Sequence, residues 1–154
     1  MALRTAEWIF DTKHDRYPVA SHLFLIDQDE RVLFMRRAGS GYADGQLGVP
    51  AGHVDLGETV TESIIRETGE ELGIKLDAGD LVFAGTMFRR SQEPRVDYFF
   101  TARTWEGEPT IREPHKCTEL VWASSDDLSS DVIPYLVRAL DNARTGTVFD
   151  EHGW

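Results

Sequence analysis

The 154-residue chain predicts an α/β fold, an α/β/α sandwich in which a mixed β-sheet lies between helices. Several short apolar segments are separated by turn-forming residues, which is typical of the strands of a sheet. One central segment and one late segment repeat their apolar residues at helical spacing. The sequence contains no internal repeat, low-complexity tract or linker, so we expect a single domain over residues 1–154.

The first strands are expected in the N-terminal half of the chain. Residues 19–27 have the sequence VASHLFLID, which is typical of a strand, and the polar turn 27–30 leads to a second strand over 31–36. These two strands are expected to form a hairpin. Residues 37–46 contain three glycines and predict a loop, which the short apolar piece 47–50 follows.

The central helix is predicted from about Thr59 to Leu72. Thr59 and Glu62 have the spacing of a capping box, and Gly73 is a natural end for the helix. One side of this helix is formed by residues at helical spacing, namely Val60, Ile64, Ile65, Thr68 and Leu72. The pattern predicts an amphipathic helix whose apolar side packs against the sheet.

The C-terminal half predicts further strands and a second helix. Strands are expected over 81–89 and 96–103, with a turn between them, and a shorter strand is expected over 119–123. The second helix is predicted over 131–143, with Asp131 as its N-cap residue.

Composition restricts the classes of partner. Lys and Arg total 16 whereas Asp and Glu total 27, a net charge of -11, which disfavours long nucleic acids and anionic membranes. A small anionic ligand that arrives with a cation remains compatible with this charge. A lone cysteine, Cys117, forms no internal disulfide and favours a reducing compartment. No apolar run is long enough to span a bilayer, and Met1–Phe10 lacks a signal-peptide pattern, so we expect a cytoplasmic protein.

The central helix carries a cluster of acidic residues. Glu67, Glu70 and Glu71 project from one face, at the border of the apolar side. Their like charges destabilise a helix unless they are compensated, which Arg66 does in part. A divalent cation such as magnesium or manganese would compensate them further, because clustered carboxylate oxygens suit hard ions. The alternative interpretation is a solvated acidic face on an amphipathic helix.

Residues 52–74, GHVDLGETVTESIIRETGEELGI, resemble the Nudix box, G-x5-E-x7-R-E-U-x-E-E-x-G-U, in which U is a bulky apolar residue. Thr68 occupies the first U position, a departure that costs packing but no ligand. The chain is therefore identified as similar to MutT-like members of the Nudix hydrolase superfamily. The matching positions are Gly52, Glu58, Arg66, Glu67, Glu70, Glu71, Gly73 and Ile74.

The resemblance implies a Nudix-type α/β/α sandwich and a pyrophosphohydrolase that uses Mg²⁺ or Mn²⁺ and water to cleave the diphosphate linkage of a nucleoside diphosphate derivative. It implies a structural role for Arg66, which orients a glutamate, and a supporting role for Glu58 at the helix entrance. The implied catalytic residues from the box are Glu67, Glu70 and Glu71. The implied metal ligands are Gly52, through its backbone carbonyl, and Glu67, Glu70 and Glu71.

The resemblance extends more loosely beyond the box. Residues 105–109, followed by Glu113, are similar to the loop that carries an extra glutamate in MutT-like enzymes, so Glu113 is a further catalytic candidate. An exposed loop glutamate is the alternative. Arg37, Arg90 and Asp131 are candidate substrate contacts, to phosphate or to a base edge. For Arg37 the alternative is a solvated arginine at a strand end.

Two weaker patterns have structural alternatives. His115, Cys117 and Glu119 alternate as on one face of a strand, but three mixed residues without a second cluster favour a partly buried polar strand over a zinc site. Three aromatic side chains could stack on a base, although core packing is the more common role: Tyr42, Phe88 and Tyr98.

Substrate markers known from Nudix subfamilies are missing downstream of the box. Arg90 occupies the position where ADP-ribose-type members often carry proline, and the dinucleoside polyphosphate and coenzyme A markers are also missing. By elimination we expect a nucleoside triphosphate, cleaved to monophosphate and pyrophosphate. The alternatives are an ADP-ribose or nucleotide-sugar pyrophosphatase and a non-catalytic nucleotide-binding Nudix sensor. The sequence specifies no base, and the resemblance leaves a homodimer open.

Overall fold

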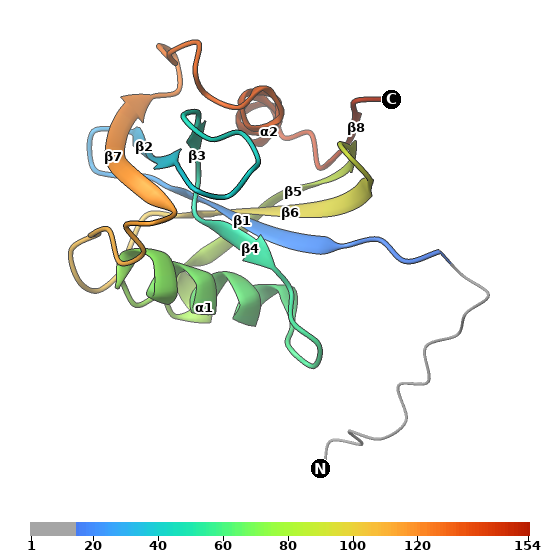
Figure 1. The fold of residues 1–154 in the computed structure, drawn as a ribbon. Helices are drawn as coiled ribbons and strands as arrows, with labels where there is room; N and C mark the ends of the chain where they lie inside the picture. The colour runs from blue at the N-terminus through green and yellow to red at the C-terminus, as the bar shows by residue number, and fades with distance from the viewer. Residues whose placement is uncertain (1–14) are drawn as a thin grey trace.

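Two β-sheets form the centre of the structure, a computed structural model that describes residues 15–154 (Figure 1). The interpretation of Met1–Phe10 lies outside these described residues. The elements in chain order are β1 (Val19–Leu25), β2 (Arg31–Arg37), β3 (Leu47–Gly48), β4 (Ala51–His53), α1 (Val60–Leu72), the 3-10 helix η1 (Ala78–Asp80), β5 (Leu81–Arg90), β6 (Pro94–Ala102), β7 (Cys117–Ser124), α2 (Pro134–Thr145) and β8 (Phe149–His152).

The larger sheet is mixed, with the strand order β4-β1-β6-β5-β8, and the smaller is antiparallel, with the order β3-β2-β7. The expected hairpin between the first two strands is wrong, because β1 and β2 belong to different sheets and share only an isolated bridge between Ile26 and Val32. Nearly all of β1 is buried, and both of its edges are paired, with β4 and with β6. A strand that is apolar on both faces is stable only in such an interior position.

The helices cover opposite faces of the larger sheet, with α1 on one side and α2 on the other (Figure 1). Successive β1 side chains point to opposite faces, so Leu23 packs in the cluster that contains Ile64 of α1. Phe24 packs in the cluster that contains Leu136 of α2. This arrangement confirms the predicted α/β class with a mixed sheet between helices.

Local signals set both ends of α1 as predicted. The Thr59 hydroxyl accepts a hydrogen bond from the Glu62 amide at 3.1 Å, and the Glu62 carboxylate accepts one from the Thr59 amide at 2.7 Å. Gly73 ends the helix with φ 70°, a left-handed conformation that glycine adopts without strain. Thr68 is fully buried, and its hydroxyl donates to the Ile64 carbonyl at 2.8 Å, so its polar atom is satisfied.

The last helix and the C-terminus differ from expectation. Helix α2 begins at Pro134 with Ile133 as its N-cap, so the prediction that Asp131 caps it is wrong. The Asp131 carboxylate instead accepts hydrogen bonds from Arg36 and Ser129. Strand β8 was not predicted; it pairs in parallel with β5. Within residues 15–154, none of the helices combines the length and apolar character that crossing a membrane requires.

Candidate functional site

A cleft with a volume of about 530 Å³, open to solvent, is lined by residues from both helices and from strands β1, β2, β4, β5 and β6. Its carboxylates are Glu67 and Glu71 of α1, beside Gly52 of β4, together with Glu93. A smaller pocket of about 80 Å³ shares Glu71 with the cleft and adds Glu113. The structure therefore brings two of the box glutamates and the expected extra glutamate to adjoining pockets.

Glycine at position 52 allows Glu67 to lie directly against β4. A Cβ at this position would overlap the carboxyl group of Glu67. The Glu67 side chain is 15% exposed, and burial raises its pKa, with Arg66 acting in the opposite direction. The close packing of helix and strand thus holds a desolvated carboxylate at one end of the cleft.

Glu71 lies one helical turn after Glu67 and is more strongly perturbed. Its carboxylate accepts a hydrogen bond from the Ala51 amide at 3.3 Å. Burial raises its pKa well above the usual range, and the nearby charges of Glu67 and Glu113 raise it further. These three carboxylates therefore repel one another in a shielded place, which a cation would relieve.

The oxygen donors of this cluster suit Mg²⁺ or Mn²⁺. Their convergence is incomplete, because within residues 15–154 no three His, Cys, Asp or Glu side chains are already arranged to hold an ion. The fit is therefore one of donor chemistry and charge. Glu67 and Glu71, with Glu113, are the residues that could hold a divalent cation.

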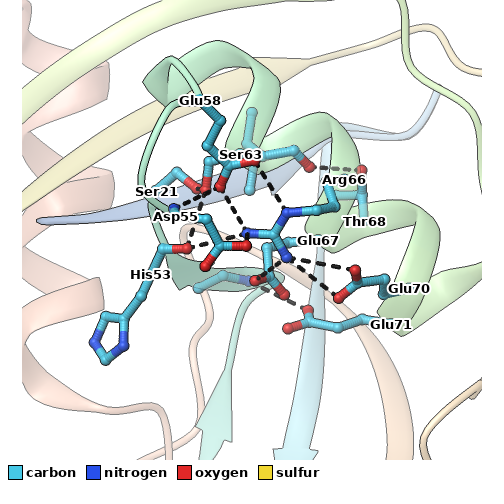
Figure 2. Close-up of polar contacts among 12 residues, drawn as sticks. Ser21, His53, Asp55, Glu58, Ser63, Arg66, Glu67, Thr68, Glu70 and Glu71 are labelled. Atoms are coloured by element: carbon cyan, nitrogen blue, oxygen red, sulfur yellow. Dashed lines mark hydrogen bonds and ion pairs between the residues drawn. The ribbon is translucent and has the colours of Figure 1, made fainter. Parts of the chain in front are cut away.

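Arg66 links the helix entrance to this cluster (Figure 2). Its guanidinium donates two hydrogen bonds to Glu58, at 3.1 and 2.7 Å, and one to Glu67 at 2.8 Å. It also donates a hydrogen bond to the His53 carbonyl at 3.1 Å, which connects β4 to the helix. The hydrogen bonds from Arg66 lower the pKa of Glu58 to about 2. Glu58 thus remains a carboxylate that fixes the position of Arg66.

Glu70 differs from the other box glutamates in its surroundings. Its side chain is 52% exposed, and its carboxylate lies 3.3 Å from Arg66 (Figure 2). It does not line the cleft or the smaller pocket. Helical geometry explains the difference, because Glu67 and Glu71 are four residues apart and share one line along the helix, whereas Glu70 is turned by about 100° from Glu71.

The three candidate substrate contacts have different places. Arg37 lines both pockets and donates to the Tyr42 carbonyl at 3.0 Å. Arg90 does not line them, because its guanidinium lies over the Trp154 ring, 5.8 Å from its centroid, at the opposite side of the strand. Asp131 is engaged by Arg36 outside both pockets. The structure therefore does not bring Arg90 and Asp131 to the cleft.

Other candidate residues are dispersed or lie elsewhere. His115 is exposed and precedes β7, Cys117 is buried, and Glu119 forms an ion pair with Arg36 at 2.7 Å. These three side chains form no metal-binding group within the described residues. Of the three aromatic candidates, only Tyr42 lines the cleft.

Sequence reasoning missed several polar residues of the cleft. Arg89 and Asp97 are joined by a buried ion pair with a distance of 2.6 Å, and His22 lies 3.0 Å from the Tyr135 hydroxyl. Lys116 lies at the mouth of both pockets, 3.5 Å from Glu113. The sequence signal for these residues was a polar side chain inside an apolar strand segment, such as His22 in VASHLFLID.

Comparison with known proteins agrees with this geometry. The family model of the NUDIX domain matches residues 16–142. The chain is 28% identical over 103 residues to an 8-oxo-dGTP diphosphatase from Escherichia coli, which covers 66% of this chain and 79% of the relative. It is also 36% identical over 50 residues to an ADP-ribose pyrophosphatase from Methanocaldococcus jannaschii. That match covers 32% of this chain and 29% of the relative.

Solved structures have the same fold. The structure of a MutT NUDIX hydrolase from Burkholderia pseudomallei is similar with a TM-score of 0.76 and 27% identity, over 83% of this chain and 98% of that one. A MutT protein from Methanosarcina mazei has a TM-score of 0.75 at 17% identity, over 86% of this chain and 96% of that one, and supports the fold alone. The chain therefore belongs to the Nudix family, as a MutT-like Nudix pyrophosphohydrolase.

Proposed function

We propose that this Nudix hydrolase is metal-dependent and cleaves a nucleoside triphosphate to a monophosphate and pyrophosphate. The observation that carries the proposal is the pair of shielded carboxylates that line the cleft, Glu67 packed against Gly52 and Glu71 hydrogen-bonded to the Ala51 amide. Burial raises the pKa of each carboxylate, because the charged forms lose stabilisation by water. A divalent cation, bound together with a polyphosphate, would supply positive charge that stabilises the two carboxylates.

The residues of the cleft would have different roles in the reaction. Glu67 and Glu71 would hold Mg²⁺ or Mn²⁺, with Glu113 and the Gly52 carbonyl close by. Glu70 lies outside both pockets and would have to turn away from Arg66 to become a further ligand. When bound, the cation supplies positive charge that offsets the negative charge of the diphosphate. Arg37 and Lys116, which line both pockets, pair with phosphate oxygens.

A carboxylate must accept a proton from the attacking water. Glu113 is the candidate outside the box, because it shares the smaller pocket with Glu71. Its carboxylate lies 3.5 Å from the Lys116 ammonium. Arg66 and Glu58 act by positioning, since their hydrogen bonds hold β4 and Glu67 in place.

A triphosphate is favoured over ADP-ribose by the extent of the similarities. The relative from Escherichia coli is matched over 79% of its length, whereas the archaeal ADP-ribose pyrophosphatase is matched over 29%. A pure nucleotide sensor is disfavoured, because it gains nothing from a cluster of mutually repelling carboxylates.

The test is a nucleotide panel with Mg²⁺ in which the products are identified. Release of a nucleoside monophosphate with pyrophosphate from triphosphates supports the proposal, whereas ribose 5-phosphate and AMP from ADP-ribose alone would overturn it. Glu70→Gln and Glu71→Gln should each lower turnover by about a hundredfold or more while the fold survives. Glu106→Gln, a change at a carboxylate that is 78% exposed, is the matched control and should retain activity.

A further inference from the structure

A buried polar cluster lines the cleft away from the box carboxylates. It consists of Arg89, Asp97, His22 and Tyr135, which come from β5, β6, β1 and α2. Arg89, His22 and Tyr135 line the cleft, whereas Asp97 is fully buried beside Arg89. The Arg89 side chain is 5% exposed and that of Asp97 is fully buried, with 2.6 Å between the guanidinium Nε and a carboxylate oxygen. The Arg89 guanidinium also lies 3.7 Å from the centroid of the Tyr135 ring.

Packing alone does not require this cluster. Desolvating an ion pair costs several kcal/mol per ion, and well-packed apolar residues of similar volume often serve stability equally well. Met87 and Phe99, the neighbours of Arg89 and Asp97 on the same strands, already belong to an apolar core. A buried charged pair whose arginine also lines a ligand cleft therefore points to recognition.

The sheet fixes where the cluster lies relative to the carboxylates. Going from Gly52 on β4 to β5 crosses β1 and β6, three strand spacings or about 14 Å, and reaches Thr86. Arg89 lies three residues farther along β5, about 10 Å, so the two backbone positions are roughly 17 Å apart. Arg89, Tyr135 and Glu67 line one continuous cleft. If the phosphates of a nucleotide lie at the box glutamates, as the proposed function requires, the base extends toward Arg89.

The cluster offers hydrogen-bond donors without a large excess of charge. Asp97 lies 2.6 Å from Arg89 and 3.3 Å from Arg95, so its charge offsets one of these two guanidinium groups. With the phosphates of the substrate at the box glutamates, Arg89 is left to bind a neutral acceptor. The guanidinium has five N–H donors, of which Nε is used on Asp97 and one Nη1 hydrogen on the Tyr42 hydroxyl, at 3.4 Å. Its plane is held by the Tyr135 ring, so the remaining donors are presented rigidly.

We propose that Arg89 selects the base of the substrate and favours an unmodified guanine-type purine. Adjacent O6 and N7 acceptors of such a base match the two parallel N–H donors of a guanidinium. Adenine would place its amino group against these donors. In 8-oxoguanine N7 carries a hydrogen, so this base also loses one of the two acceptors. Tyr42, at the edge of the same cleft, provides an aromatic face for stacking.

The proposal is tested by comparing kcat/KM for five triphosphates: GTP, ITP, 7-deaza-GTP, ATP and 8-oxo-GTP. GTP and ITP, which both have the O6 and N7 acceptors, should be the best substrates. The other three should each be poorer by about tenfold, the value of one good bidentate contact. A kcat/KM for ATP equal to that for GTP, or 8-oxo-GTP as the best substrate, would overturn the proposal.

Titration calorimetry with GMP and AMP separates this inference from the proposed function, because it requires no hydrolysis. Binding of GMP about tenfold tighter than AMP supports base selection even if no triphosphate is cleaved. Equal affinities overturn base selection even if triphosphates are cleaved.

A variant pair locates the selection at Arg89. Arg89→Lys keeps a cation beside Asp97 but removes the planar pair of donors, so the ratio of kcat/KM for GTP over ATP should fall to near one. Arg103→Lys is the matched control, because Arg103 is 57% exposed, forms an ion pair with Glu30 and does not line the cleft. An unchanged ratio in a folded Arg89→Lys protein would overturn the assignment.

Discussion

We expect the buried ring of His22 to make the fold sensitive to acid. The residue is 2% exposed, and burial lowers the pKa of its imidazole from 6.5 to about 4. The negative charge of Asp97 opposes this change, whereas the positive charges of Arg89 and Arg95 add to it. In the folded protein His22 is therefore neutral at all pH values well above 4.

The size and sign of the effect follow from the difference between the folded and unfolded states. The unfolded chain takes up a proton on His22 as the pH falls below 6.5, whereas the folded chain does so only near pH 4. Each pKa unit corresponds to about 1.4 kcal/mol, so folding loses about 3 kcal/mol across this interval. Above pH 6.5 the group has no further effect, and below about pH 4 the loss is complete.

Urea denaturation of the wild type and of His22→Gln, over pH values from above 6.5 to below 4, measures this loss. Glutamine keeps a hydrogen-bonding group near Tyr135 but does not titrate. Titration of the other groups is common to both proteins, so the free-energy difference between them should change by about 3 kcal/mol across the interval. Parallel pH profiles for the two proteins would refute the reasoning.

Three further predictions concern the Nudix box. Gly52→Ala should displace Glu67 and lower kcat/KM by about tenfold or more, with little change in unfolding free energy because the overlapping atoms belong to the end of a side chain and not to backbone; normal steady-state kinetics would contradict this. Gly73→Ala should cost about 1 kcal/mol in urea denaturation, because φ is 70°, and an unchanged midpoint would count against it. Glu58→Gln should cost about 2 kcal/mol by removing the charged partner of Arg66, and an unchanged thermal midpoint would argue against that linkage.

Features encoded within a few residues were predictable from the sequence. The capping box of Thr59 and Glu62 and the end at Gly73 depend on nearest turns, so α1 agrees with its pattern to within a residue or two. The hairpin of β1 and β2 was mispredicted because the partners of β1 come from distant segments. No local rule indicates that a nearly fully buried strand will be paired on both edges.

The site was predictable where helical spacing defines it and not where strand alternation does. Glu67 and Glu71 follow from their separation along α1. Arg90 was predicted and Arg89 was missed, because a β-bulge between Phe83 and Gly85 shifts the alternation of β5. The cap expected at Asp131 failed because Arg36, distant in sequence, engages its carboxylate.

The order of strands in the larger sheet has a consequence for which substrates can be accommodated. Backbone hydrogen bonds join β4, β1, β6 and β5, so the separation between Gly52 and Arg89 cannot change without breaking the sheet. Adjustment to bulkier or smaller ligands is therefore left to the connections that line the cleft, among them residues 38–46, whose glycines at 39, 41 and 45 all have positive φ. Exchanging residues 38–46 between relatives would change the width of ligand that the cleft accepts and would leave the separation between Gly52 and Arg89 unchanged.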